Sequence, residues 1–305
     1  MRILLGVDGE GISQISDHRE CWPAYPQYWT VGRSKFTADL VAAARGLLRG
    51  GASEVLVFDG HGDGTWHNVL IDQLPEGVRM FNSGSDAFDS WFQVGAHSRC
   101  GTPNGFISHT NVPYFRVAIN GNLATESHLE ALEWGSLPIG ITGDAALDPE
   151  LDDFLSGVPF LPVKRSRSRT ATQPLSPEAE ASAEAIQSFA EICAKHSQIH
   201  RKSSVPKTFK VSFSFDPILT KKAEGVHGLR RSSQSVLSIR VHDWKRFEPA
   251  YEAARIAALE PYIEANSGVD LSSEKEMKRQ DPRKLRKVRS FIETWTRTNY
   301  PAWRD

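Results

Sequence analysis

The sequence has few cysteines and no long apolar run. Its 305 residues include only Cys21, Cys100 and Cys193, which are far apart. An odd number of scattered cysteines makes neither a disulfide framework nor a CxxC metal site, and it is typical of a reducing compartment. The apolar run at residues 3–7 is too short for a signal peptide, and no stretch approaches the length of a membrane span. We therefore expect a cytoplasmic protein without a membrane partner.

An excess of charge of either sign is also missing. Lysine and arginine number 36 and aspartate and glutamate 37, so the formal net charge is −1. This balance gives no reason to expect nucleic acid as a partner. Basic residues do gather in a helix predicted over residues 273–298, but Val288, Phe291 and Trp295 recur there at the spacing of a packing face. The pattern favours a solvated helix that docks on protein over a helix that binds nucleic acid.

Apolar runs and helical patterns alternate in the first half of the chain. Residues 3–7 and 54–58 read as short buried strands, and residues 34–48 between them carry apolar side chains at helical spacing before Gly50 and Gly51. Such a βαβ unit builds parallel sheet. Further strands are predicted at residues 78–81, 91–95, 138–142 and 158–163, a hairpin around residues 120–121, and helices at residues 126–134 and 149–155.

The second half has a different pattern. A long helix is predicted after Ser176 and Pro177, followed by strands at residues 209–215 and 235–241 and by helices at residues 244–265 and 273–298. We expect an α/β protein with a mainly parallel sheet flanked by helices in its N-terminal part and a smaller α+β C-terminal part. The expected domains are residues 1–157, which carry a metal site, and residues 158–305, which end in a helical extension.

Five groups of metal-capable side chains stand near the ends of these elements: Asp8-Gly-Glu10, Asp59-Gly-His61, His97, His109 and Glu126. The first three follow predicted strands, where α/β sheets bind their ligands. Mixed histidine and carboxylate ligands suit zinc, manganese or cobalt and are typical of hydrolases that activate water with a metal. The sequence contains neither a GxSxG nucleophile elbow nor an HExxH zinc helix.

The order of these groups resembles the zinc D-aminopeptidase family of the dipeptide-operon type. The similarity is collinear over about residues 1–180 and is carried by Gly6-Val-Asp8-Gly-Glu10-Gly, Asp59-Gly-His61, Gly95-Ala-His97-Ser-Arg99, Ser108-His109, Glu126 and Gly143-Asp144. The resemblance implies two zinc ions per chain, with Asp8, Glu10, His61, His97 and Glu126 as ligands and Asp8 as the bridge. It also implies that His109 is catalytic outside the metal shell, and that the chain forms ring-shaped homo-oligomers such as a decamer.

The sequence departs from the family pattern in places that bear on specificity. Asp-Gly-His replaces the usual Asp-Ser-His, and the chain beyond about residue 180 has no matching motif. The expected function is hydrolysis of an amide or peptide bond in a small peptide or amide by metal-activated water; Mn²⁺ and Co²⁺ suit the same ligands. The alternatives are a metal-dependent esterase or phosphoesterase, and a non-catalytic metal-binding assembly protein.

Two further features allow two interpretations each. The basic tract at residues 164–170 either holds an anionic group of the substrate or contacts another subunit. Asp144 is either a carboxylate that supports the metal ligands or the cap of a helix. The cap is the favoured interpretation of Asp144.

Overall fold

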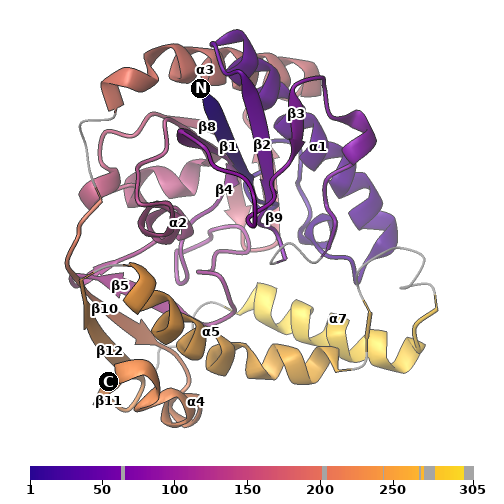
Figure 1. The fold of residues 1–305 in the computed structure, drawn as a ribbon. Coiled ribbons are helices and arrows are strands. Elements are labelled where there is room, and N and C mark those ends of the chain that lie inside the picture. The colour runs from indigo at the N-terminus through magenta and orange to yellow at the C-terminus, as the bar shows by residue number, and fades with distance from the viewer. Residues whose placement is uncertain (63–65, 201–204, 243, 268, 271–278, 299–305) are drawn as a thin grey trace.

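The protein is built on two sheets (Figure 1). The computed structural model describes residues 1–62, 66–200, 205–242, 244–267, 269–270 and 279–298, and the fold concerns these. The larger sheet has the strand order β3-β2-β1-β4-β7-β8-β9. All of its neighbouring strands run parallel except β8 and β9. Its strands are β1 (Arg2–Val7), β2 (Glu54–Asp59), β3 (Val78–Met80), β4 (Ser90–Ala96), β7 (Ile141–Asp144), β8 (Phe160–Ser168) and β9 (Ala171–Pro174).

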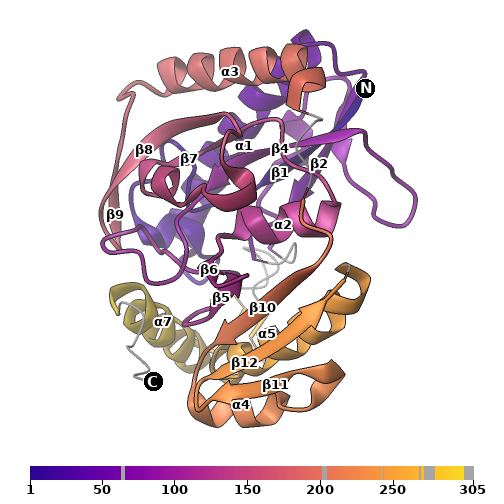
Figure 2. The ribbon, with the colours of Figure 1, turned by 90° about the vertical axis from the view of Figure 1, so that its left-hand side faces the viewer.

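Helices cover both faces of this sheet. Ile3 and Leu5 of β1 face helices α1 (Pro26–Arg49) and α3 (Ala179–His200), whereas Leu4 packs on the side of α2 (Glu126–Trp134). Because both faces are covered, β1 and β2 carry apolar side chains on both sides, in the continuous runs that predict buried strands. Helices α1 and α3 lie side by side on one face (Figure 2).

The smaller sheet is antiparallel where its strands pair, in the order β11-β12-β10-β5-β6. Its strands are β5 (Arg116–Ile119), β6 (Asn122–Leu123), β10 (Phe209–Ser214), β11 (Arg230–Ser233) and β12 (Val236–Val241). Helix α5 (Trp244–Asn266) packs on it through stacked rings of Phe213 and Phe247, and α4 (Pro217–Ala223) lies beside α5. A mainly parallel sheet followed by a smaller α+β part confirms the predicted fold class.

The two sheets do not follow the expected boundary between residues 157 and 158. Strands β8 and β9 continue the larger sheet, because Ile141 of β7 pairs in parallel with Phe160 of β8. Strands β5 and β6 lie before that boundary but belong to the smaller sheet. The helix predicted at residues 149–155 is instead two 3₁₀ helices, Ala145–Glu150 and Asp153–Leu155, and Pro149 lies within the first.

The C-terminal helix α7 (Pro282–Arg297) is shorter than predicted, and the part of the prediction at residues 273–278 lies outside the described residues. Of the three residues predicted to form its packing face, Val288 and Trp295 are buried and Phe291 is partly buried against the core; Ile292 is buried beside them. Helix α7 runs beside α5, below the strands of the larger sheet in Figure 1. Among the described residues, no helix combines the length and hydropathy needed to cross a membrane.

Candidate metal site

Six side chains meet at the carboxyl ends of β1, β2 and β4. They form the metal-site cluster, which consists of Asp8, Glu10, His61, His97, His109 and Glu126. Nδ1 of His61 lies 3.1 Å from Asp8 Oδ1 and 3.1 Å from Glu10 Oε2. Nε2 of His97 lies 3.2 Å from Asp8 Oδ2 and 3.5 Å from Glu126 Oε1. Asp8 therefore presents one carboxylate oxygen to each of two groups of donors.

Two glycines allow the loop after β1 to approach β4. The Gly11 amide donates to the carbonyl oxygen of Gly95 at 2.7 Å, and a Cβ on Gly11 would overlap with the Ala96 carbonyl oxygen. Gly95 has a φ of 80°, in the left-handed region that favours glycine. This close approach holds Glu10 opposite His61.

Backbone carbonyls fix the tautomers of the three histidines. His61 Nε2 donates to the Cys21 carbonyl oxygen at 2.8 Å, and His97 Nδ1 donates to the Ser98 carbonyl oxygen at 2.9 Å. His109 Nδ1 donates to the Ile107 carbonyl oxygen at 2.7 Å. A carbonyl oxygen only accepts, so these ring nitrogens carry hydrogen, and in the neutral rings the other nitrogens present lone pairs. A partner that fixes the tautomer in this way is usual for histidines that bind metal.

The electrostatics of the metal-site cluster favour a bound cation. Burial opposes the charge of Asp8, but hydrogen bonds and charges from His61 and His97 outweigh it and hold its pKa well below the ordinary value. Burial likewise opposes protonation of His61 and His97, yet Glu10 and Asp8 raise the pKa of His61, and Glu126 and Asp8 raise the pKa of His97. Without metal, protons therefore balance the carboxylates; a metal cation would replace them.

Glu10 Oε2 and His97 Nε2 are buried and face only other members of the cluster, without a hydrogen bond of ordinary geometry. Buried polar atoms that lack such a bond are rare and call for an explanation such as an ion. Donor atoms of Asp8, Glu10 and His97 lie within 4.8 Å of one another, as do those of His97, His109 and Glu126. Nitrogen and carboxylate donors at this spacing fit zinc.

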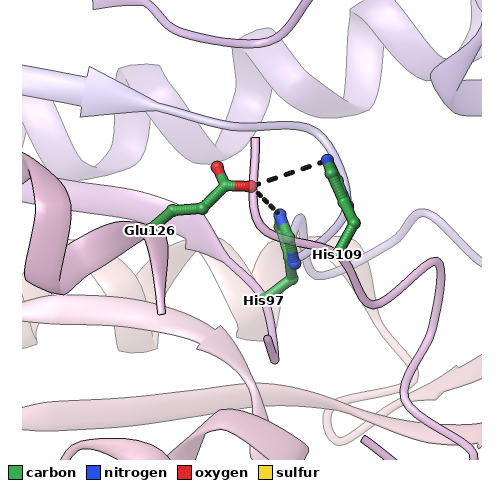
Figure 3. Close-up of side chains that lie close together, drawn as sticks. All are labelled: His97, His109 and Glu126. Atoms are coloured by element: carbon green, nitrogen blue, oxygen red, sulfur yellow. Dashed lines mark ion pairs between the residues drawn. The ribbon is translucent and has the colours of Figure 1, made fainter. Parts of the chain in front are cut away.

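His109 stacks on His97, with ring centroids 4.3 Å apart and an interplanar angle of 11°. Its Nε2 lies 3.6 Å from Glu126 Oε1, so both imidazoles point toward the same carboxylate oxygen (Figure 3). Burial and the neighbouring His97 lower the pKa of His109, which keeps its imidazole neutral. A neutral imidazole at the edge of the cluster is suited to take up and release a proton.

Asp59 does not join the metal-site cluster. Its carboxylate accepts from the backbone amide of Asn68 at 2.8 Å and from Asn68 Nδ2 at 3.0 Å. Asn68 Nδ2 also donates to the His61 carbonyl oxygen at 2.9 Å, so Asp59 supports the segment that carries His61.

Asp144 accepts from the amide of Ala146 at 3.1 Å and caps the 3₁₀ helix that follows it, which is the interpretation that the sequence favours.

The basic tract at residues 164–170 is largely part of β8, and two of its side chains are buried. Lys164 Nζ donates to the carbonyl oxygens of Ile12 and Ile15 at 3.2 and 2.9 Å. Arg169 Nη1 donates to Ser108 Oγ at 2.7 Å. These two residues therefore support the loops that carry Glu10 and His109.

A cavity of about 260 Å³ opens beside the metal-site cluster. Its lining includes Asp8, Glu10, His61, His109 and Glu126 of the cluster. It also includes Trp22 and Trp66 and four residues of the C-terminal helices: Arg255, Leu259, Tyr262 and Trp295. Sequence reasoning missed these four, which we call the C-terminal wall, because no motif connects them to residues so distant in the chain.

The fold and the cluster are those of a metallopeptidase-like α/β protein, and sequence comparison places the chain in a family. The family model described as D-aminopeptidase matches residues 1–253, so the chain belongs to the D-aminopeptidase family and is a peptidase. The D-aminopeptidase of Bacillus subtilis strain 168 is 28% identical over 191 residues, which are 58% of this chain and 68% of that protein.

A solved structure has the same fold. It is the Zn-dependent D-aminopeptidase DppA from Bacillus subtilis, described as a self-compartmentalizing protease. The two structures align with a TM-score of 0.69 and 20% identity over 84% of this chain and 96% of that one. The family resemblance recognised in the motifs is thereby confirmed.

Proposed function

We propose that the protein is a two-zinc hydrolase that removes an N-terminal D-amino acid from a small peptide or amide. The observation that carries the proposal is the position of Asp8, whose two carboxylate oxygens face two separate groups of donors. Asp8, Glu10 and His61 would hold one ion, and Asp8, His97 and Glu126 the other. Zinc is supported by the donor chemistry and by the zinc dependence of the solved D-aminopeptidase of the same fold.

Bound zinc would supply an activated water at neutral pH and polarise the substrate carbonyl. The remaining chemistry belongs to the protein. His109 Nε2 carries no hydrogen because Nδ1 donates to Ile107, so Nε2 receives the proton that the attacking water loses. The same nitrogen then delivers this proton to the leaving amine, which completes the cleavage. A free amino group on the substrate would bind an ion or a nearby carboxylate of the cluster, which would account for aminopeptidase specificity.

The proposal is tested by a side-by-side assay of the full chain. Amides and dipeptides of D-amino acids, their L-counterparts and simple phosphate esters are offered before chelation, after chelation and after zinc is restored. We expect hydrolysis of the D-amides and D-dipeptides that chelation abolishes and zinc restores. Hydrolysis of phosphate esters alone would establish the phosphoesterase alternative, and no turnover of any substrate would favour a metal-binding assembly protein.

We further propose that the chain forms a homo-oligomer larger than a dimer. The solved D-aminopeptidase of the same fold is described as self-compartmentalizing, which supports a closed assembly such as a ring. The three cysteines are buried and free, which supports a cytoplasmic location. Light scattering at micromolar concentration tests the assembly, and a monomeric mass would contradict it.

A further inference from the structure

One wall of the cavity comes from a part of the chain beyond the family model. The family model matches residues 1–253, whereas all four residues of the C-terminal wall, from Arg255 to Trp295, come later in the chain. We propose that this wall, together with Trp22 and Trp66, receives an apolar side chain on the first residue of the substrate. Helices α5 and α7 would thus determine which small amides and dipeptides the enzyme accepts. This inference rests on the function proposed above.

The aromatic rings form a continuous surface that ends at the catalytic histidine. Trp22 contacts Trp66 edge to face with centroids 5.3 Å apart, and it contacts Trp295 in the same way at 5.2 Å. The ring of Trp295 also lies edge-on to His109 at 5.3 Å. A side chain attached next to the reacting carbonyl would therefore lie against these rings and leave water.

The size of the cavity limits what it can hold. Its volume of about 260 Å³ lies below the ~300–1,000 Å³ typical of sites for drug-sized ligands. Leu259 and Tyr262 line the cavity from α5, so the size of their side chains limits the space available to a bound side chain. The cavity suits one amino-acid residue with a leaving group better than an extended peptide.

The wall is held in place by polar contacts near the end of α7. Tyr25 donates from its hydroxyl to Glu293 Oε1 at 2.8 Å. Arg169 Nε donates to the Thr296 carbonyl oxygen at 3.1 Å, and the same guanidinium donates to Ser108 Oγ. Arg169 thus joins the end of α7 to the residue before His109. Because the wall is already ordered, binding a side chain against it costs no further conformational entropy of the protein.

Binding of amino-acid hydroxamates to the zinc-loaded full chain tests the inference by calorimetry. D-leucine hydroxamate should bind about 10- to 100-fold more tightly than glycine hydroxamate, because the isobutyl group is buried. Leu259→Trp fills the cavity and should reduce this ratio to about 1 while glycine hydroxamate still binds. Ile263→Trp is the matched control, because Ile263 is 49% exposed on the same helix and is not among the lining residues.

A second variant enlarges the cavity. Tyr262→Ala should improve the binding of D-tryptophan hydroxamate relative to D-leucine hydroxamate by about tenfold. It also keeps the inference testable if Leu259→Trp does not fold. Equal or undetectable binding of the leucine and glycine probes by the native protein would overturn the inference, as would ratios that neither variant changes.

Hydrolysis of glycine amide, the smallest substrate, separates this inference from the proposed function. Turnover of glycine amide without selectivity among the hydroxamates would refute the side-chain pocket and leave the hydrolase intact. Selective binding without turnover of any amide would refute the proposed function and leave the pocket intact.

Discussion

Replacing His97 and His109 by glutamine should have opposite effects on metal binding and catalysis. Both Nε2 atoms point to Glu126 Oε1, at 3.5 and 3.6 Å, but only His97 also lies 3.2 Å from Asp8. We therefore expect His97→Gln to lose the zinc ion that His97 shares with Asp8 and Glu126. His109→Gln should keep zinc and lower kcat by roughly 10²-fold, the usual loss when proton transfer or oxyanion stabilisation is removed.

The expected difference can be expressed as a shift in melting temperature. Free zinc at 100 times its Kd stabilises a one-site protein by about 2.7 kcal/mol. With 305 residues and an unfolding entropy of about 2.1 cal/mol/K per residue, this corresponds to a rise in melting temperature of about 4 °C for each ion bound. A site weakened roughly 100-fold gains only about 0.4 kcal/mol at the same zinc concentration, which is less than about 1 °C.

Thermal unfolding with and without zinc, together with elemental analysis, measures this difference. The native protein and His109→Gln should both show the rise that two bound ions give, about 8 °C, whereas His97→Gln should show only the rise of about 4 °C from the ion at Asp8, Glu10 and His61. Equal zinc content and equal shifts in the two variants would refute the division between ligand and catalytic residue.

Three further predictions concern stability, the loop after β1 and proton release. Ile292→Ala should lower the free energy of unfolding in urea by about 2–5 kcal/mol, because Ile292 lies on the buried side of α7. The control Ile256→Ala, at an exposed position of α5, should change it by less than about 0.5 kcal/mol. Equal effects would mean that α7 is not part of the core. Gly11→Ala should sharply reduce zinc content, since the added Cβ overlaps with β4 and displaces the loop; normal zinc content would contradict this. Zinc binding should release protons and strengthen as pH rises, because the raised pKa values of His61 and His97 leave both imidazoles protonated without metal. Calorimetry in two buffers of different ionisation enthalpy measures the release, and identical heats would contradict it.

Elements with complete local signals were predictable from the sequence. Helix α2 has the predicted bounds, residues 126–134, because Thr125 caps its first turn and Gly135 adopts the left-handed conformation after its end. The apolar runs of β1 and β2 were equally clear. Strands β9 and β11 and helix α4 are short and carry many polar residues, so their conformation depends on pairing and packing rather than on local pattern.

The site was predictable where it follows the strands and not where it depends on distant helices. Asp8, His61 and His97 stand near strand ends, and the rule for parallel sheets brings them together. Glu126 and His109 were recognised through family motifs, since nothing in their local pattern places them there. Leu259 and Trp295 reach the cavity only because α5 and α7 pack back on the first half of the chain.

Anomalous diffraction at the zinc edge from crystals of the zinc-loaded protein tests the central claim most directly. The account predicts two peaks per chain, one between Asp8, Glu10 and His61 and the other between Asp8, His97 and Glu126. A single peak, or peaks away from Asp8, would contradict a two-zinc site at the ends of β1, β2 and β4.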